Sequence, residues 1–545
     1  MGAYRFSMAP NISVPRSKFR MPFTHSTSFF HGKLVPIDCF EILPGDEFKC
    51  DFSALIRMST PIAPIFGNIK AHVHAFFIPM RLVWEHTKEF YGENKTSAGY
   101  QQTNYSIPTM TINSSNKPDT HSVSAYLGKP LPNGVYGNSA LKVSCLKERC
   151  YYLVWSEYYR AQQLQNPVLL SVGDTNGIGT ITSGHGNSDL GTTTTTINFG
   201  TPCMNVCKEF DYFTACTTSP QYGSAVTLPL GTTAPIIIQN DTGSSISSNQ
   251  NGYVVNPSAI GALGTGPSKW GISGNNSAGT LLADLSNATA ASINTIRYAF
   301  QVQKWLERAN FGSRFFEMLN LHYGVTSPDA RLQRPEYLGG CEFYVNVDQV
   351  VSMAGYDAST NQQVGQPGAI SVTGIKNKNL FHKAFVEPGY LLVVISTTQE
   401  RLYSQGVLRE DSRQDRFDFY FPEFANLGDM AVKNKEIYAG KITDDGILGY
   451  QEHWAEYRYR ANRASGLLNP NAANALDYWT LGDKFAALPT LSNSFIMEDR
   501  TNISRALVTG SSGPDYIADF HFNYTAIREM PLYTIPGLVD HFGTM

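Results

Sequence analysis

The sequence predicts a mainly β protein, built as an antiparallel sandwich or barrel with inserted helices and long surface loops. Short segments rich in β-branched and aromatic residues are scattered over the whole chain, and each is bounded by Gly, Pro or Asn. They do not alternate regularly with helices, which argues against a parallel α/β sheet. At 545 residues the chain is long enough to bury a large core.

The clearest strand signals lie in 68–79, 341–351, 389–397 and 517–528. Two helices are also expected. In 148–165 the apolar residues follow a 3.6-residue spacing until Asn166-Pro167 ends the pattern. A second helix begins after Asn294, which serves as its N-cap, and runs to Gly312. Each helix has one apolar face to bury, so we expect both to lie against the sheet.

Residues 231–292 differ in composition from the segments around them. They contain three charged side chains, Asp241, Lys269 and Asp284, among many Ser, Thr, Asn, Gly and Ala residues. Structureless loops of this length are uncommon in compact domains, and scattered apolar residues give this one something to pack. We therefore expect a projecting insertion in a core formed by residues 38–230 and 293–545.

The chain carries few charges for its length. Charged residues make up 16% of it, against roughly 25% in an average globular protein. The formal net charge of -3 offers no overall attraction to nucleic acid. A weakly charged surface suits permanent burial against other copies of the same chain better than life as a free monomer.

No segment of the sequence suggests membrane insertion. Nothing approaches the roughly 20 apolar residues of a membrane span, and the first residues, MGAYRFSMAPNISVPR, lack the apolar stretch of a signal peptide. The eight cysteines are expected to be reduced thiols, because their spacing resembles no disulfide framework.

Residues 1–37 are expected to form an extended basic arm. No acidic residue precedes Asp38, and several prolines in the segment resist helix formation. The candidate contacts with single-stranded nucleic acid in this arm are Arg5, Arg16, Lys18, Arg20 and Lys33. Arms of this kind also clasp adjacent subunits, so the sequence leaves both uses open.

A second candidate for nucleic-acid contact is 454–463, WAEYRYRANR, which interleaves aromatic and basic residues. This combination binds single strands through base stacking and phosphate contact. In a strand, three of the four candidate residues would share a face; the four are Trp454, Arg458, Arg460 and Arg463. The alternative is an aromatic core face whose arginines pair with acids such as Glu452 and Glu456.

The sequence carries no recognisable enzyme motif. A phosphate-binding loop, a zinc H-E-x-x-H motif and a G-x-S-x-G nucleophile elbow are all missing. His72 and His74 would face the same side of a strand, but without nearby ligands they are expected to be surface or interface histidines. We therefore expect no catalytic residue, no cofactor and no metal site.

Seven long strings are distributed over nearly the whole chain. They are LPGDEFKCDFSALIRMSTPIAPIFGNIKAHVHAFFIPMRLVW (43–84), RCYYLVWSEYYRAQQLQNPV (149–168), DYFTACTTSPQYGSAVTLPLG (211–231), YGVTSPDARLQRPEYLGG (323–340), FYFPEFANLGDMAVKNKEIY (419–438), GYQEHWAEYRYR (449–460) and MPLYTIPGLVDHF (530–542). In sequence and in order they closely resemble the major capsid protein of the gokushoviruses, which are small tailless single-stranded-DNA bacteriophages of the Microviridae.

This resemblance implies an eight-stranded antiparallel jelly-roll β-sandwich that assembles into a T=1 icosahedral shell around a circular single-stranded DNA genome. It places the chain in the virion, assembled in the bacterial cytoplasm. The insertion at 231–292 occupies the place of a loop that forms a protrusion at the threefold axes and is proposed to meet a host receptor. Further implied partners are a small basic DNA-packaging protein and a scaffolding protein.

Two other readings compete with this one. The chain could be a secreted carbohydrate-binding or carbohydrate-cleaving β protein, in which aromatic residues stack on sugars and two carboxylates act as catalysts. That class predicts a monomer with a concave acidic cleft. A minor spike or structural protein of the same virion is the other alternative.

Overall fold

A computed structural model describes residues 15–93, 105–131, 141–191, 193–226, 236–239, 280–283, 293–312, 314–345, 349–351, 367–370, 373–440 and 444–533. The chain divides into two compact units. We name them the main unit, Met1–Pro220 with Gly312–Met545, and the inserted unit, Gln221–Phe311. The insertion expected at 231–292 falls within the inserted unit.

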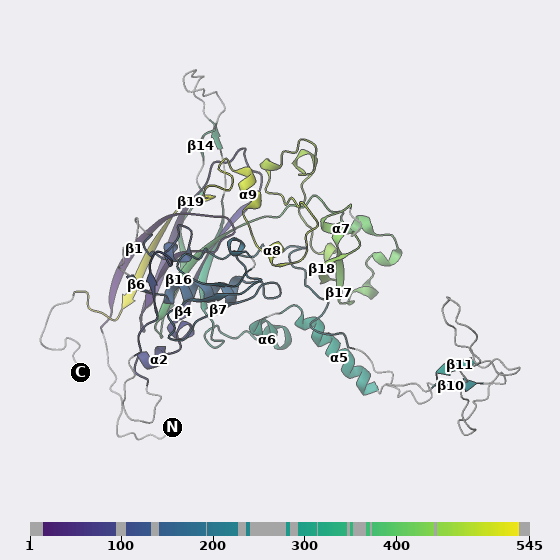
Figure 1. Cartoon of the computed structure of the whole chain (residues 1–545), viewed down its shortest axis with the longest axis horizontal. Helices are drawn as coiled ribbons and strands as arrows, with labels where there is room; N and C mark the ends of the chain where they lie inside the picture. The colour runs from purple at the N-terminus through teal and green to yellow at the C-terminus, as the bar shows by residue number, and fades with distance from the viewer. Residues whose placement is uncertain are drawn as a thin grey trace, which may run out of the picture. The chain divides into compact units, whose positions relative to one another are not determined.

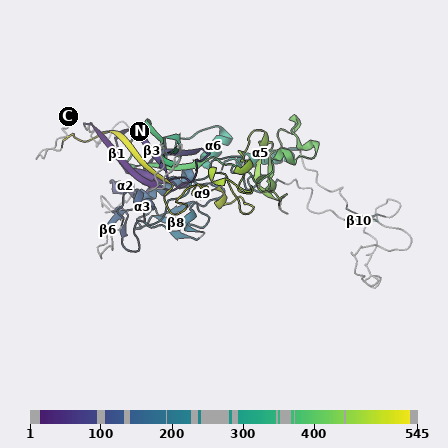
Figure 2. The same ribbon diagram turned by 90° about the horizontal axis from the view of Figure 1, so that it is seen from above.

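The main unit is built on two four-stranded antiparallel sheets. The first has the order β1 (Ser17–Phe29), β19 (Tyr516–Arg528), β3 (Glu47–Met58) and β15 (Thr373–Ala384). The second has the order β12 (Glu336–Tyr344), β4 (Ile69–Pro79), β16 (Gly389–Gln399) and β2 (Val35–Ile42). Strands β1 and β19 come from opposite ends of the chain and lie side by side (Figures 1 and 2).

Alternating burial along the strands explains why the two sheets share one core. In β3 the side chains of Phe48, Cys50, Phe52 and the following even-numbered residues are buried, whereas those at odd positions are exposed or half-buried. Strand β19 shows the same alternation. The buried faces of both sheets belong to a single hydrophobic cluster. This is the period of two that a sheet with one covered face imposes.

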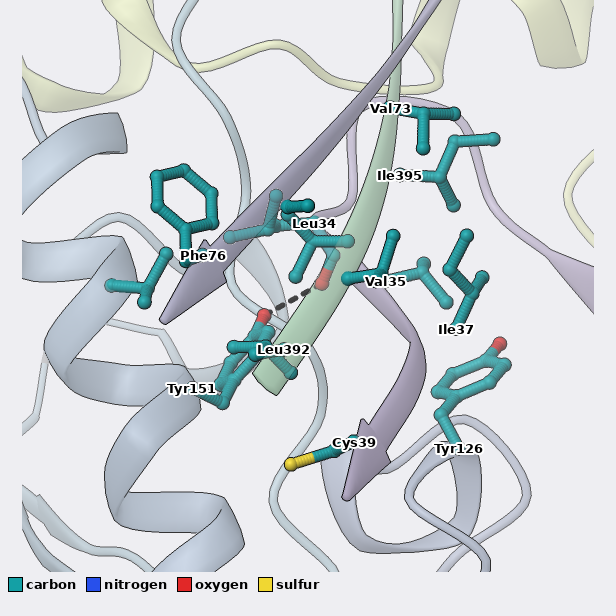
Figure 3. Packing of buried hydrophobic residues seen from close by; sticks show 14 of the residues in the cluster. Leu34, Val35, Ile37, Cys39, Val73, Phe76, Tyr126, Tyr151, Leu392 and Ile395 are labelled. Atoms are coloured by element: carbon teal, nitrogen blue, oxygen red, sulfur yellow. Dashed lines mark hydrogen bonds between the residues drawn. The ribbon is translucent and has the colours of Figure 1, made fainter. Parts of the chain in front are cut away.

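Strand β16 is buried along its whole length. Helix α4 (Leu146–Val154) contacts it, and the Tyr151 hydroxyl of this helix donates a hydrogen bond to the Leu34 carbonyl at 2.7 Å (Figure 3). The bond ties the helix to the residue just before β2. A strand covered on both faces reads as a continuous apolar run, as GYLLVVIST does.

The structure confirms three of the predicted strands, β4, β16 and β19, to within two residues. The strand predicted at 341–351 is wrong at both ends. Strand β12 starts at Glu336 and stops at Tyr344, and Gln349–Val351 forms a separate strand, β13, paired with β14 (Pro367–Ile370). The sequence pattern missed the true start of β12 because Gly339 and Gly340 resemble a turn. A Cβ atom on Gly340 would lie 2.6 Å from the Val73 carbonyl oxygen, so close backbone approach requires glycine there.

The first predicted helix is shorter than its apolar pattern. After α4 the chain widens into a π-helical turn, Trp155–Tyr159, and Arg160 is already extended. The Gln165 side chain accepts the Ala161 N–H at 2.9 Å, and Arg160 donates to the Gln165 carbonyl at 2.8 Å. These bonds stabilise a turn where the helix was expected to continue. The second predicted helix is α5 (Ile293–Ala309), in the inserted unit.

Smaller elements fill the connections. The helices are α1 (Met80–Val83), α2 (Thr87–Phe90), α3 (Val123–Tyr126), α6 (Phe315–Tyr323), α7 (Asn434–Ile437), α8 (Asn493–Ile496) and α9 (Thr501–Ala506). The strands are β5 (Thr109–Ile112), β6 (Leu141–Ser144), β7 (Val168–Leu170), β8 (Gly179–Ile181), β9 (Thr195–Thr196), β10 (Ile236–Gln239), β11 (Thr280–Ala283), β17 (Asp429–Lys433) and β18 (Ile447–Glu452). No helix in the described ranges is long and apolar enough to cross a bilayer.

A second, smaller hydrophobic cluster supports the long connection between β16 and β19. Its buried members are Tyr212, Phe213, Cys216, Tyr403, Met430, Val432, Ile437, Leu448, Ala455 and Phe495. The hairpin of β17 and β18 contributes to this cluster and pairs antiparallel. The connection therefore has a core of its own and holds its surface residues in defined positions.

Candidate nucleic-acid interface

The predicted basic arm is a strand of the sheet over most of its described length. Residues Ser17–Phe29 pair with Arg528–Tyr516 as β1, at the edge of the first sheet. The boundary drawn at residue 37 is therefore wrong, because it falls inside β2. Pro22 resists a helix but is tolerated in an edge strand, where its missing N–H can face away from the ladder. Arg5 lies outside the described residues.

Lys18 and Arg20 lie on the outward face of the first sheet. Both side chains are exposed, and neither pairs with a carboxylate in the described part of the chain. Arg20 is opposite Thr525, and Thr525 is opposite Lys49 on β3, so the two cations stand two strands apart in one row. Adjacent strands are about 4.8 Å apart. The register thus gathers positive charge that a nucleic-acid backbone can reach.

Arg16 has a partner at the surface. Its guanidinium lies 2.8 Å from the Glu529 carboxylate, and both side chains are partly exposed. An exposed pair of this kind is weak and screened by salt. Arg16 can therefore exchange the carboxylate for a phosphate, but it contributes less free positive charge than Lys18 and Arg20.

Lys33 must be removed from the set of candidate contacts. It is 6% exposed, and its ammonium lies 2.8 Å from both the Asp189 carboxylate and the Asn205 side-chain oxygen. Burial lowers the pKa of Lys33, and the charge of Asp189 opposes this shift. A lysine whose ammonium is enclosed by internal partners cannot reach a phosphate, so the expectation that it contacts DNA is wrong.

The segment 454–463 does not form the strand in which its residues would share a face. Trp454 adopts a left-handed backbone conformation with φ of 67°, and Ala455–Tyr457 forms a 3₁₀ turn. The Trp454 ring is 6% exposed, and its indole N–H donates to the Phe424 carbonyl at 2.9 Å. The expectation that Trp454 stacks on a base is therefore wrong, because the ring is already part of the interior.

The three arginines of this segment differ in their partners. Arg458 forms an ion pair with Glu452 and donates to the His453 carbonyl at 3.2 Å. Arg460 and Arg463 are exposed and make no ion pair with a described carboxylate. Glu456, named with Glu452 in the alternative reading, binds Arg413 instead, at 3.0 Å.

Sequence reasoning missed Lys49 and the exposed aromatic residues of 417–421. Lys49 lies in the same row as Arg20 only because of the register between β3 and β19, and no local sequence pattern encodes that register. The signal for the aromatic residues was the string FDFYF itself. Its alternation resembles a half-buried strand, but ten consecutive residues, 414–423, are exposed in the structure.

The histidine pair of β4 is held by side chains of its own subunit. His72 lies 3.0 Å from the Thr398 hydroxyl and 3.3 Å from the Glu209 carboxylate, and His74 lies 2.6 Å from the Tyr159 hydroxyl. Burial and the nearby His72 lower the pKa of His74 to about 4. In the described ranges no group of three or more His, Cys, Asp or Glu side chains is placed to hold a metal ion.

Comparison with known proteins identifies the family. The family model described as "Capsid protein (F protein)" matches residues 7–538. The capsid protein VP1 of Bdellovibrio phage phiMH2K is 35% identical, with 99% of this chain and 98% of the relative aligned. VP1 of Chlamydia phage 1 is 32% identical and VP1 of Spiroplasma virus 4 is 33% identical, each over 98% of this chain and 97% of the relative. The chain therefore belongs to the F/VP1 capsid protein family of the Microviridae, as a structural component of the virion and not an enzyme.

Proposed function

We propose that the chain is the major capsid protein that assembles with copies of itself into a closed T=1 icosahedral shell around a circular single-stranded DNA genome. Membership in the capsid family carries this proposal and counts against the carbohydrate-cleaving alternative. Abundance in purified particles, measured by gel densitometry, separates a major from a minor capsid role.

The strand order supports a jelly roll for the main unit. The eight strands of the two large sheets are, in chain order, β1, β2, β3, β4, β12, β15, β16 and β19. Counted in this way, the strands of the first sheet have the order first, eighth, third, sixth. The second has the order fifth, fourth, seventh, second. An eight-stranded jelly roll made of two Greek keys has this interleaved order. The long connections between strands then supply most of the contact surface.

Size-exclusion chromatography of the purified wild-type chain tests assembly. We expect pentamers or larger species at micromolar concentration, because many large apolar side chains of the main unit are exposed in a single copy. Contacts between identical copies add through multivalency, so the transition from subunit to shell should be steep in protein concentration. A stable monomer at every concentration counts against the proposal.

For DNA we propose loose contact without sequence readout, through Lys18 and Arg20 on the outward sheet face. Lys49 adds to this positive surface, although it shares its charge with Asp51 at 3.5 Å. Backbone contacts of this kind hold the strand without reading its bases. With a net charge of -3 the chain cannot neutralise a genome, so we further propose that a small basic packaging protein supplies more positive charge.

Neutralising both cations, Lys18→Gln with Arg20→Gln, should weaken binding of single-stranded DNA more at low salt than at high salt. Losing two phosphate contacts should make the slope of log affinity against log salt shallower by roughly 1.4. Fluorescence anisotropy with a labelled oligonucleotide gives this slope. The matched control is Arg16→Gln, which removes a paired cation from the residue just before the same strand. Equal losses at both salts would instead favour a clasp between subunits.

We propose that residues 231–292 form the surface protrusion at the threefold axes and take part in host attachment. The inserted unit supports this, since its bounds, Gln221–Phe311, contain the whole segment. Its strands β10 and β11 pair antiparallel, with Ile236 opposite Ala283. The two ends of the intervening loop therefore return to the same point, as an insertion into a loop requires. A scaffolding protein and a host receptor complete the proposed partners.

Deleting residues 235–290 should leave a soluble, folded main unit. A shortened loop closes at little entropic cost, and no strand of the two large sheets is lost. The midpoint of thermal unfolding should stay within a few degrees of the wild type. A deletion of 240–279, which keeps β10 and β11, is the control. Insoluble protein from the larger deletion alone would show that the main unit depends on the inserted unit.

A further inference from the structure

The main unit exposes a group of aromatic side chains beside β17 and β18, the hairpin labelled in Figure 1. We name as the aromatic strip Phe417, Phe419, Tyr420, Phe421 and Tyr457, which are between 42% and 61% exposed. Together their uncovered surface is on the order of 500 Å², given 150–250 Å² for a fully exposed ring. The largest apolar patch on a typical monomer is about 300–600 Å² and often functional.

Contacts with the buried Trp454 ring and with Arg413 fix the position of the strip. The ring centroid of Tyr420 lies 5.7 Å from that of buried Trp454 and 6.2 Å from that of Tyr457. The Arg413 guanidinium lies between the rings of Tyr457, at 4.6 Å, and Phe419, at 5.3 Å. Short 3₁₀ turns at Arg416–Asp418 and Pro422–Phe424 fix both ends of the segment. The rings are therefore presented in defined positions.

The charges around the strip do not suit a nucleic acid. Residues 409–424 carry three arginines and five carboxylates, which gives a net charge of -2. Arg413 lies 3.0 Å from Glu456 and Arg409 lies 2.9 Å from Glu436, so internal acids already neutralise both guanidinium groups. A site that binds single strands needs stacking rings together with unpaired cations. Residues 409–424, which supply four of the five rings, have an excess of negative charge. The fifth ring, Tyr457, is followed in the chain by the exposed Arg460 and Arg463.

The size and apolar character of the strip suit a protein surface. A standard protein interface buries about 800 Å² on each partner, with aromatic residues enriched at its centre and charges depleted. The strip would supply more than half of that area. A cleft of about 630 Å³, lined by Phe417 and Trp454 together with charged side chains, adjoins it and offers a recess for a projecting side chain.

We propose that the aromatic strip is a contact surface between copies of this chain in the shell, and that it does not bind DNA. The proposal rests on the shell function proposed above and names one of its interfaces. A second copy is the partner because the function proposed above is assembly with identical copies, and the strip supplies more than half of the roughly 800 Å² that one side of a standard interface buries. The negative charge of residues 409–424 disfavours a polyanion over the four rings of that segment.

The test uses the full chain with Phe417→Ser and Phe421→Ser combined. Both side chains are exposed, so the isolated subunit should unfold at the wild-type temperature. Sedimentation velocity over a range of concentrations should show that the concentration needed for assembly rises at least tenfold. The control, Phe417→Tyr with Phe421→Tyr, keeps both rings and should remain within twofold of the wild type. Tyr457→Ser, from the other segment, serves as an independent variant should the double variant not fold.

The outcomes separate the interface from the function. A folded serine variant that assembles at the wild-type concentration overturns the interface alone. Shells that form normally but hold less DNA, measured by the ratio of absorbance at 260 and 280 nm, would make the strip a nucleic-acid surface and also overturn it. A wild-type chain that never assembles overturns the proposed function and this interface with it.

Discussion

Replacing Phe52 with alanine is expected to destabilise the subunit by about 3–5 kcal/mol, the usual cost of removing a buried phenylalanine ring. Phe52 lies in the middle of β3 and is fully buried. Its ring centroid is 5.1 Å from that of Phe522 and 6.1 Å from that of Phe520. Deleting the ring leaves a cavity between the two sheets. Urea unfolding of the unassembled subunit measures the loss.

A matched control comes from the same strand. Leu55 points to the opposite face of the first sheet and is 51% exposed. Leu55→Ala should cost less than about 1 kcal/mol, because an exposed side chain leaves no cavity. Similar losses for the two variants would contradict the burial pattern that makes the two sheets share a core.

Replacing Glu498 with alanine is expected to cost about 3–5 kcal/mol as well, because it leaves a buried cation without one of its partners. The Glu498 carboxylate is fully buried, 2.5 Å from the Arg401 guanidinium and 3.1 Å from His31. Arg401 is itself almost fully buried and also contacts Asp483 at 2.8 Å. The hydrogen bond of His31 and the ion pairs of Arg401 join the segment before β2 to the connections on either side of α8. Thermal unfolding of the soluble subunit measures the effect.

The same network should make stability depend on pH. Burial alone would raise the pKa of Glu498, but the charge of Arg401 and the hydrogen bond from His31 hold that pKa below its ordinary value. A carboxyl with a lowered folded pKa contributes stability that is present above its unfolded pKa of about 4.3. That contribution is lost as the pH falls through the folded pKa.

A comparison of the wild type with Glu498→Ala isolates the pH dependence. The wild type should lose stability below about pH 4, whereas Glu498→Ala should lose less over the same range because it lacks the titrating group.

An exposed ion pair is the control for the buried one. Lys484→Ala breaks an exposed pair with Asp477, 3.0 Å away, and should cost no more than about 1 kcal/mol. A loss as large as that of Glu498→Ala would mean that burial does not set the strength of these pairs.

Local composition was enough to predict the strands whose residues are uniformly apolar or alternate regularly. It succeeded for β4, β16 and β19 and failed for β12, where two glycines that the close approach of β4 requires resemble a turn. Local composition could not predict which strands pair with each other. Ser17 pairs with Arg528 across almost the whole chain, and no feature of either segment specifies the other.

The candidate site was predicted only in part, because composition does not report burial. Lys18 and Lys33 looked equivalent in an acid-free segment, yet Lys33 is enclosed by Asp189, which lies far along the chain. The order of aromatic and basic residues in 454–463 does not specify whether the segment is a strand or a turn. In the structure it is a turn, and the Trp454 ring is buried. The family itself was accessible from sequence, because long strings in a fixed order carry more information than any single residue pattern.

Electron cryomicroscopy of the purified wild-type chain, at a concentration where chromatography shows its largest species, tests the central claim most directly. The shell function predicts closed particles of T=1 icosahedral symmetry in which every subunit contains the two four-stranded sheets. The proposed interface, which rests on that function, further predicts that a neighbouring subunit covers the aromatic strip. A uniform population of 60.2 kDa monomers with no closed particles would contradict it.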